Sequence, residues 1–204
     1  MGKKWNTERK NEHYYKKAKK QQYRSRASYK LLQLNKRFKV IKSGDKVVDL
    51  GAAPGGWSQV ALEAVGEEGL VIGVDLEWIR PLDDENFLTI RGDFTEENIL
   101  TETKKLLSGM AQVVVSDASP KLCGIKDIDN FKSAELADNA LKVCDHLLMH
   151  SGNFILKVFQ GEEFENIVRN IKERFKTVKT TKPPSSRKGS VEMYVVAKGF
   201  RRMF

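Results

Sequence analysis

The chain has 204 residues, of which 40% are hydrophobic and 31% are charged, with a formal net charge of +9. This length suits one globular domain with its own core. No apolar run approaches the roughly 20 residues that a membrane helix needs, and the N-terminus lacks the apolar segment of a secretory signal. The two cysteines, Cys123 and Cys144, have neither metal nor redox spacing, which predicts reduced thiols in a cytoplasmic protein.

The charge is distributed unevenly along the chain. Residues 1–42 carry 15 Lys and Arg against 2 acids, residues 43–168 carry 10 against 23, and residues 169–204 carry 11 against 2. Dense basic segments bind phosphate because neutralising phosphates releases counterions, although such runs also serve as solvated surface. The first basic segment also holds aromatic rings that can stack on unpaired bases: Trp5, Tyr14, Tyr15 and Tyr23. This combination favours RNA or single strands over a membrane surface.

Residues 1–24 are polar and basic, and we expect them to form an N-terminal arm before a single domain at residues 25–204. Periodic apolar positions and turn residues divide this domain. In chain order they predict a helix from Ser25, a strand at 46–50, a helix at 55–66, strands at 69–76 and 85–94, a helix at 95–108, a strand at 111–120, a helix at 131–150, a strand at 152–161, a helix at 162–175 and a strand–loop–strand unit at 176–200. Thr95 is a predicted N-cap, with Glu96 and Glu97 in the first turn, where the helix dipole favours acids.

Strands and helices alternate in this prediction, and the strands are nearly continuous apolar runs. That pattern is typical of an α/β fold, in which helices cover both faces of a parallel sheet. Such sheets bind ligands at the carboxyl ends of their strands. The residues just after each strand are therefore the first candidates for a functional site.

Four acidic residues and one lysine fall at these strand ends. They are Asp49, Asp75, Asp93 and Asp117, with Lys157 near the end of the fifth strand. A single Asp after a strand usually forms a turn or caps a helix. Four in succession, all at the ligand-binding edge, indicate a site instead.

The segment Gly51–Gly56, which reads GAAPGG, follows the first strand. Its small residues let the backbone approach a ligand closely, but its spacing is neither the dinucleotide GxGxxG pattern nor a phosphate loop. Asp49 would repel a pyrophosphate and suits a cationic ligand such as S-adenosylmethionine, which carries an ammonium and a sulfonium. We expect Asp75 to accept bonds from the ribose of this ligand and Asp93 from its adenine, with Trp57 as a wall of the pocket.

Two charged residues interrupt apolar strands. Lys157 lies inside FILKVF and Glu192 inside GSVEMYVV. A lysine in such a strand is rarely buried without a partner, so it either snorkels to the sheet edge or acts as a base or an electrostatic anchor. Glu192 is either a solvent-facing strand position or a functional carboxylate. Lys30 lies on a helix, where it would by itself be an ordinary surface lysine.

Taken in order, the segments RSRASYKL, DLGAAPGGWSQV, SDASP, LKVF and SVEMY resemble the FtsJ/RrmJ-type RNA ribose 2′-O-methyltransferases, from about Ser25 to Ala197. The glycine segment alone indicates only the wider methyltransferase class. The more specific feature is the ordered set that matches the family's catalytic K-D-K-E tetrad: Lys30, Asp117, Lys157 and Glu192. The resemblance implies a Rossmann-like, mostly parallel sheet of seven strands with one antiparallel strand.

The resemblance also implies S-adenosylmethionine as the cofactor. It places the family's cofactor contacts on Gly55, Trp57, Asp75, Asp93 and Asp117. The charge argument adds Asp49, and the glycine segment adds Gly51 and Gly56.

The resemblance gives Lys157 the role of proton acceptor, because a ribose 2′-OH must lose its proton as it attacks the methyl carbon. We hypothesise that the positive charge of Lys30 favours the neutral form of Lys157 and that Asp117 orients it. Asp117 also borders the pocket of the methyl donor, and Glu192 aligns Lys30 or the ribose. Placement of the two reactants should supply much of the rate, since the reaction cancels the sulfonium charge.

RNA is the implied substrate, because the reacting group is a ribose 2′-OH. A uridine of large-subunit ribosomal RNA is the preferred target, and a tRNA is the alternative. The predicted RNA contacts are phosphates held by Tyr23, Arg24, Arg26, Arg187 and Lys188, and a target base stacked on Tyr194.

Two other classes of function stay open. One is a non-catalytic RNA-binding or ribosome-assembly factor that kept the fold, and the other is a nicotinamide-dependent oxidoreductase, which the missing GxGxxG disfavours. We expect no metal, because His146 and His150 stand four residues apart without a third ligand in the pattern. We also expect a monomer and no membrane partner.

Overall fold

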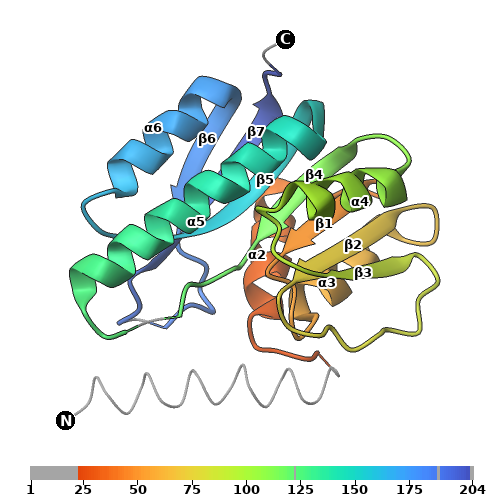
Figure 1. Ribbon diagram of the computed structural model, residues 1–204, viewed down its shortest axis with the longest axis horizontal. Coiled ribbons are helices and arrows are strands. Elements are labelled where there is room, and N and C mark those ends of the chain that lie inside the picture. Colours follow the sequence, from red (N-terminus) through yellow and green to blue (C-terminus); the bar gives the residue numbers. More distant parts are fainter. Residues whose placement is uncertain (1–22, 122, 188, 203–204) are drawn as a thin grey trace.

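The computed structural model describes residues 23–121, 123–187 and 189–202, so the predicted arm lies outside the described residues up to Gln22. The described chain forms one sheet with helices on both faces (Figure 1). Its strands are β1 (Lys46–Leu50), β2 (Leu70–Asp75), β3 (Phe87–Arg91), β4 (Ala111–Ser116), β5 (Leu148–Phe159), β6 (Phe175–Thr181) and β7 (Glu192–Phe200). Its helices are α2 (Ser28–Phe38), α3 (Gly56–Val65), α4 (Glu97–Leu107), α5 (Lys126–Leu147) and α6 (Phe164–Arg174).

The seven strands lie in the order β3-β2-β1-β4-β5-β7-β6. The pairs among β1 to β5 are parallel, and β7 runs antiparallel to both of its neighbours. This confirms the predicted α/β fold with a mostly parallel seven-stranded sheet. Because the chain order reverses between β1 and β4, the crevice at the carboxyl ends of these two strands is the position where such sheets bind ligands.

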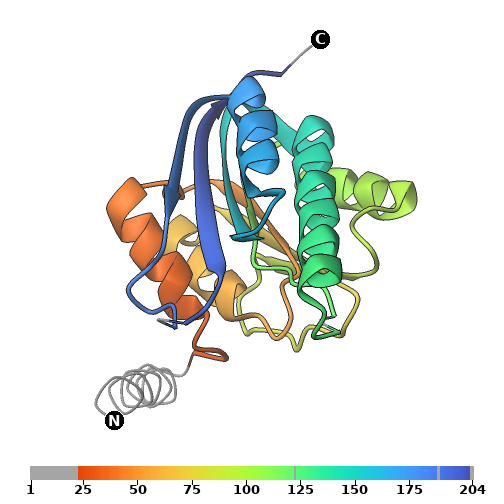
Figure 2. The same ribbon diagram turned by 90° about the vertical axis from the view of Figure 1, so that its left-hand side faces the viewer.

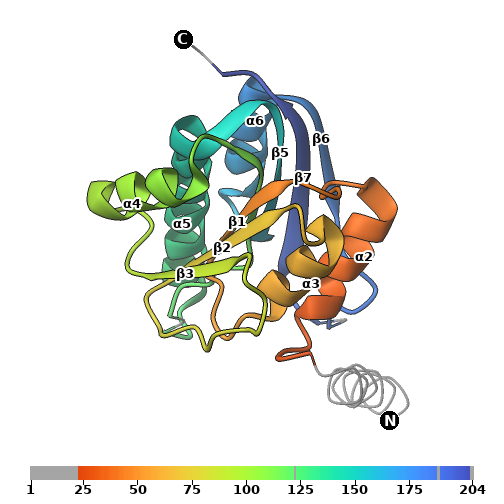
Figure 3. The same cartoon turned by 90° about the vertical axis from the view of Figure 1, so that its right-hand side faces the viewer.

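Helices α2 and α3 cover one face of the sheet, and α4, α5 and α6 cover the other (Figure 2). The view from the opposite side shows the same two layers around the strands (Figure 3). Successive side chains of a strand point to opposite faces of the sheet. Val47 therefore belongs to the core beneath α2 and α3, whereas Val48 belongs to the core beneath the other helices.

Helix α5 begins earlier than the predicted range of 131–150. It starts at Lys126. The carboxylate of Asp129 accepts hydrogen bonds from the backbone N–H groups of Cys123 (2.8 Å) and Gly124 (3.0 Å), which closes the turn in front of the helix. An acid in the first turn also interacts well with the helix dipole. The prediction missed these residues because the first turns of the helix carry few apolar positions.

The other end of α5 also differs from the prediction. The helix ends at Leu147 and β5 begins directly at Leu148, not at 152. Strand β5 then continues through Ser151, which has φ +64°, with an irregular register against β4. The apolar run crosses from helix to strand without a break, so periodicity does not mark the boundary.

Helix α4 starts at Glu97, and Thr95 is not its N-cap. The N-cap position is Glu96, which makes no side-chain capping bond. The backbone N–H and the hydroxyl of Thr95 instead donate to Oδ1 of Asp93, at 2.9 and 2.8 Å. A short polar side chain that bonds locally in this way competes with helix capping. The structure thus ties Thr95 to the loop that carries Asp93.

Helix α2 begins at Ser28 rather than at Ser25. The buried hydroxyl of Ser28 donates to the backbone carbonyl of Gly56 at 2.8 Å. This bond fixes the first turn of α2 against the first turn of α3, at the edge of the sheet where the strands end.

The turn after β1 passes very close to the turn after β4. Gly51 has φ +72°, a backbone conformation that residues with a side chain rarely adopt. A Cβ atom added there would lie 2.6 Å from Cβ of Ala118. Both the dihedral angle and the close approach therefore require glycine at this position.

The substitution Gly51→Ala should destabilise the protein more than Gly44→Ala. Gly44 has a similar φ of +79°, but a Cβ atom there meets nothing within 4 Å. Gly44→Ala should therefore cost only the backbone strain of about 1–2 kcal/mol, and Gly51→Ala should add about 1–3 kcal/mol of overpacking. Urea unfolding of both variants measures the difference, and equal losses would contradict this account of the turn.

Candidate active site

The carboxyl ends of the parallel strands bring the predicted acids to one edge of the sheet. Asp75 ends β2, and Asp117 directly follows β4. Asp49 lies in β1, which pairs with both of these strands. Asp93 follows β3, the outer neighbour of β2. The topology therefore gathers all four residues as predicted.

Asp75 and Asp93 hold the loops that follow their strands. Asp75 accepts the backbone N–H groups of Ala53 (2.9 Å) and Glu77 (2.8 Å), so it links the glycine segment to the loop after β2. Asp93 accepts the two bonds from Thr95. Both side chains are only partly buried, and a carboxylate has about four acceptor positions. Each therefore keeps capacity for the hydroxyl or amino group of a ligand.

Asp49 lies wholly inside the molecule, with an exposed fraction of 0%. Its Oδ2 accepts the hydroxyl of Ser58 at 2.7 Å, while Oδ1 has no hydrogen-bond partner among the described residues. Burial raises the pKa of this carboxyl to about 7, with the Asp117 and Asp75 charges adding to the effect and the Ser58 bonds opposing it. The predicted direct contact with a cofactor does not fit this position. Asp49 lies in β1, directly before the turn that begins at Gly51.

Asp49 should make stability depend on pH. Its carboxyl holds a proton more tightly in the folded state (pKa about 7) than in the unfolded chain (about 3.9). The contribution of Asp49 to the free energy of unfolding therefore falls as pH rises from about 4 to about 7, and it is constant at higher pH. Between pH 5 and pH 8, the wild type should lose about 2–3 kcal/mol more unfolding free energy than Asp49→Asn. Urea titrations at the two pH values test this, and equal losses in both proteins would contradict it.

Trp57 does not form a wall of the cofactor pocket, contrary to the prediction. Its side chain is 3% exposed, and its indole N–H donates to the backbone carbonyl of Ala27 at 3.0 Å. Its ring lies 5.9 Å from that of Tyr194. Trp57 therefore fastens α2 to α3. Its contribution to a ligand site is limited to its backbone N–H in the first turn of α3, where helices leave such groups without partners.

The glycines at the start of α3 are required by close packing. Gly55 has φ +102°, and a Cβ atom at Gly56 would lie 2.2 Å from Oγ of Ser25. The segment before α2 thus presses directly on the glycine segment. Any ligand at the first turn of α3 contacts a backbone that this segment holds in place.

Arg24 belongs to this fastening and not to a free RNA-binding surface, which corrects the prediction. Its guanidinium donates to three backbone carbonyls, those of Pro54 (3.2 Å), Arg80 and Pro81 (2.6 Å). Its backbone N–H donates to the side chain of Gln59 at 2.8 Å. Arg24 therefore joins the glycine segment to the loop after β2.

Tyr23 is also engaged with the body of the protein. Its hydroxyl donates to Glu63 at 2.7 Å, and its ring meets that of Tyr29 edge-on at 5.6 Å. The predicted role in holding phosphate does not fit a hydroxyl that is bonded to a carboxylate. Lys188 lies outside the described residues, so its predicted RNA contact stays a prediction.

The four residues of the predicted tetrad form two ion pairs at this edge. Nζ of Lys30 lies 2.9 Å from Oε2 of Glu192, and Nζ of Lys157 lies 3.4 Å from Oδ1 of Asp117. Nζ of Lys157 also donates to the backbone carbonyl of Asp117 at 2.6 Å. Both lysines are buried. The snorkelling and surface interpretations of Lys157 and Lys30 are therefore wrong for this structure.

Tyr194 links the two ion pairs. Its hydroxyl donates to Oδ1 of Asp117 at 2.8 Å, and Nζ of Lys30 lies 5.4 Å from the centre of its ring. Its exposed fraction is 0%, and burial raises the pKa of its hydroxyl, as do the charges of Asp117 and Glu192. The predicted stacking of a target base on Tyr194 is wrong for this structure, because protein atoms already cover both the ring and the hydroxyl.

Glu192 keeps its negative charge within this group. Burial by itself raises the pKa of this carboxyl, but the charge and hydrogen bond of Lys30, together with the charge of Lys157, lower it overall. Each lysine of the tetrad is thus matched by a carboxylate. Asp117 and Glu192 thus lie where they can orient Lys157 and Lys30, and those roles stay predictions.

Tyr194→Phe should lower turnover while the ring packing stays intact. The substitution removes only the hydroxyl that donates to Asp117, and a hydrogen bond to a charged group is worth about 1.5–3 kcal/mol. We therefore expect kcat for methyl transfer to fall about tenfold or more, with the KM for RNA within about twofold of the wild type. Steady-state kinetics measure both, and a rise in KM with unchanged kcat would restore Tyr194 as a base contact.

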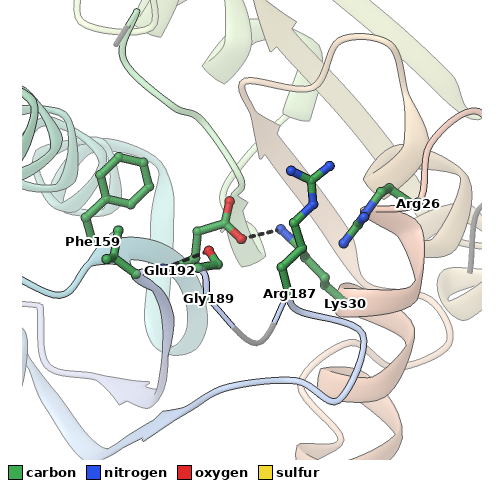
Figure 4. A pocket seen from close by; sticks show the side chains of 8 residues that line it. Arg26, Lys30, Phe159, Arg187, Gly189 and Glu192 are labelled. Carbon is green, nitrogen blue, oxygen red and sulfur yellow. Dashed lines mark hydrogen bonds and ion pairs between the residues drawn. The ribbon is translucent and has the colours of Figure 1, made fainter. Parts of the chain in front are cut away.

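A pocket of about 590 Å³ opens beside the Lys30–Glu192 pair (Figure 4). Arg26 and Arg187 both line it, and burial followed by the Arg187 charge lowers the pKa of Arg26; their phosphate contacts stay a prediction. Arg26 donates to the backbone carbonyl of Ser185 at 3.3 Å, which holds the β6–β7 loop against α2. The complete lining is Arg26, Lys30, Phe159, Arg187, Gly189, Ser190, Val191 and Glu192.

Sequence analysis missed the apolar part of this lining, Phe159 and Val191. Phe159 stands two residues after Lys157, so the period of a strand puts both on one face, and that spacing was an available signal. Val191 lies in the loop before β7, where no pattern distinguishes it.

Three observations concern the other expectations. No helix in the described part of the chain has the length and apolar character to cross a membrane. Within the same residues, no three His, Cys, Asp or Glu side chains gather in a way that could hold a metal ion. Cys123 is exposed, Cys144 is buried, and both are free thiols.

The sequence model of the FtsJ-like methyltransferase family matches residues 23–200. The chain belongs to this family. It is 58% identical to ribosomal RNA large subunit methyltransferase E of Methanobrevibacter smithii, over 98% of this chain and 96% of that protein. It is 54% identical to the protein of that name from Methanothermobacter thermautotrophicus, over 98% of this chain and 95% of that one. The resemblance drawn from the motifs is confirmed, and the chain is a methyltransferase.

Solved structures agree with this placement in the FtsJ-like family. A Plasmodium falciparum protein described as a ribosomal RNA methyltransferase superposes with a TM-score of 0.80 at 29% identity, over 89% of this chain and 100% of that one. Aeropyrum pernix fibrillarin, solved with natively bound S-adenosyl-L-methionine, gives a TM-score of 0.57 at 17% identity, over 86% of this chain and 75% of that one. The second likeness shows the fold alone.

Proposed function

We propose that the protein transfers a methyl group from S-adenosylmethionine to a ribose 2′-OH of large-subunit ribosomal RNA. The observation that carries this is the pair of buried ion pairs, Lys30–Glu192 and Lys157–Asp117. They lie between the glycine turn on one side and a pocket with two arginines on the other. The target that we favour is a uridine of a 23S-type RNA in the large subunit, and the relatives named above act, by their names, on that RNA.

The residues around the glycine turn fit S-adenosylmethionine. The buried carboxyl of Asp49 has an oxygen without a partner and a pKa near 7, so a cation beyond the turn would stabilise its charged form. Asp75 and Asp93 keep acceptor capacity for the ribose and the adenine, and the first turn of α3 offers backbone N–H groups. When bound, the cofactor supplies a methyl group on a positively charged sulfur.

Lys157 is the proton acceptor in this proposal. Asp117 holds its amino group through the backbone carbonyl and the carboxylate, which fixes the amine at the end of β4. The amine of Lys157 would take the proton of the ribose 2′-OH as that oxygen becomes methylated. Lys30, held by Glu192, is the second buried lysine of this site.

RNA is the substrate that fits the charge on the open side of the tetrad. Arg26 and Arg187 line the pocket there, and guanidinium groups bind phosphates in two-point geometry. A monomer acting in the cytoplasm completes the proposal. The assembly-factor alternative leaves two buried lysine–carboxylate pairs without a role, and burying such pairs costs free energy.

The test is transfer of labelled methyl from S-adenosylmethionine to unmodified ribosomal large subunits, bulk ribosomal RNA and tRNA. The wild type should label a large-subunit nucleotide, located by its resistance to alkaline cleavage. Lys157→Ala should lower this transfer by about 100-fold or more, because general bases contribute about that factor. Label in tRNA alone would overturn the choice of substrate.

Two variants control this experiment. Lys157→Met keeps the length of the buried side chain without its amine, so it separates loss of the base from loss of packing. Lys142→Ala removes an exposed lysine of α5 that bonds only to Asn139 among the described residues, and it should transfer methyl groups like the wild type. Full activity in Lys157→Met would refute the base role.

A further inference from the structure

The pocket beside the tetrad has two chemically different walls. In Figure 4, the side chains of Arg26 and Arg187 lie on one side of the Lys30–Glu192 pair, and Phe159 lies on the other. Val191 belongs to the same lining and is 51% exposed. A pocket with a cationic wall and an apolar wall suits a ligand that is charged at one end and apolar at the other. A single nucleotide, with its phosphate and its base, is such a ligand.

The β5–β7 ladder fixes where the apolar wall stands relative to the catalytic lysine. Lys157 pairs with Tyr194, and Phe159 pairs with Glu192. Residues two apart on a strand point to the same face, as do residues directly opposite each other. These four side chains therefore form one square on the face that α2 covers. Phe159 stands one step, about 7 Å, beyond Lys157 along the strand.

Of these four side chains, Phe159 is the one without a charged or hydrogen-bonding group. Glu192 is paired with Lys30, Lys157 with Asp117, and the hydroxyl of Tyr194 with Asp117. Phe159 offers an aromatic ring and lines the pocket. Tyr194 is fully buried, whereas Phe159 is 9% exposed and lines the pocket, so Phe159 is the aromatic side chain of the square that a ligand in the pocket would meet.

Val191 extends this apolar surface. Its backbone carbonyl accepts the N–H of Gln160 at 2.8 Å, so the chain before β7 stays attached to the end of β5. That bond holds Val191 beside Phe159 and leaves its side chain half-exposed at the rim.

We infer that Phe159 and Val191 form the seat for the base of the nucleotide that is methylated. The inference rests on the proposed function, and it goes further by assigning the binding mode. The target nucleotide leaves its stack and lies across the pocket, with its ribose over the tetrad. Its base contacts Phe159 and Val191, and its phosphate faces Arg26 and Arg187. The ring of Phe159 recognises the target as an unpaired base, because a base held in a duplex cannot reach it.

The test is a double-mutant cycle between the protein and the RNA. The RNA that the wild type methylates is prepared with an abasic ribonucleotide at the target position, which keeps the 2′-OH and the phosphates. Phe159→Ala and the abasic RNA should each lower kcat/KM by about 5-fold to 100-fold, the range for stacking of one base on one aromatic ring. Combined, they should lower it no further than the larger single effect, because both remove the same contact.

Losses that multiply in the combined experiment would overturn the seat, as would unchanged kcat/KM in Phe159→Ala. Binding of S-adenosylmethionine, measured by calorimetry, should be the same in Phe159→Ala and in the wild type, which shows that the fold is kept. Should Phe159→Ala fail to fold, Val191→Ser carries the same cycle, because its position is half-exposed. Its matched control is Met149→Ser, a partly exposed apolar residue at the opposite end of β5.

The outcome separates this inference from the proposed function. A wild type that methylates no RNA refutes the proposed function and the seat with it. A wild type that methylates intact RNA, together with multiplying losses in the cycle, refutes the seat alone.

Discussion

The two buried lysines, each paired with a partly buried carboxylate, are the constraint on which the rest of this edge depends. Burying an unpaired charge is very costly, and removing one partner of a buried pair typically costs about 3–5 kcal/mol. Lys30 comes from α2 and its partner Glu192 from β7, while Lys157 comes from β5 and Asp117 follows β4. The first described helix and the last strand must therefore meet for Lys30 to be accommodated, and β4 must pair with β5 for Lys157.

The tetrad also divides the edge of the sheet electrostatically. On one side lie the carboxylates of Asp49, Asp75 and Asp93, which suit a cationic methyl donor. On the other side lie Arg26 and Arg187, which suit a phosphate. The uneven charge along the chain, acidic in the middle and basic toward both ends, becomes a separation in space. The fold thus separates a group of carboxylates from a pair of arginines along one edge of the sheet.

Neighbouring residues of similar chemistry differ in their roles, and local sequence gave no sign of it. Arg24 and Arg26 stand two apart in one basic segment. Arg24 bonds to three backbone carbonyls, those of Pro54, Arg80 and Pro81, whereas Arg26 lines the pocket beside the tetrad. Trp57 and Tyr194, predicted as ligand contacts, pack on each other in the core. A short motif indicates that a residue is needed at a position. It does not indicate whether that residue contacts a ligand or packs within the protein.

The sequence by itself determined the α/β order of elements, the gathering of four acids at one edge and the ordered tetrad. The first two follow from the local apolar period, which acts within a few residues along the chain, and the tetrad follows from the resemblance of its ordered motifs to the FtsJ-like family. Only the tertiary structure decided how the tetrad divides into two ion pairs, that Asp49 is wholly buried, and that Phe159 faces the pocket while Tyr194 does not. These facts depend on the contact between α2 and β7, more than 150 residues apart, and on strand register. Distances between segments so far apart arise only when the whole chain is packed.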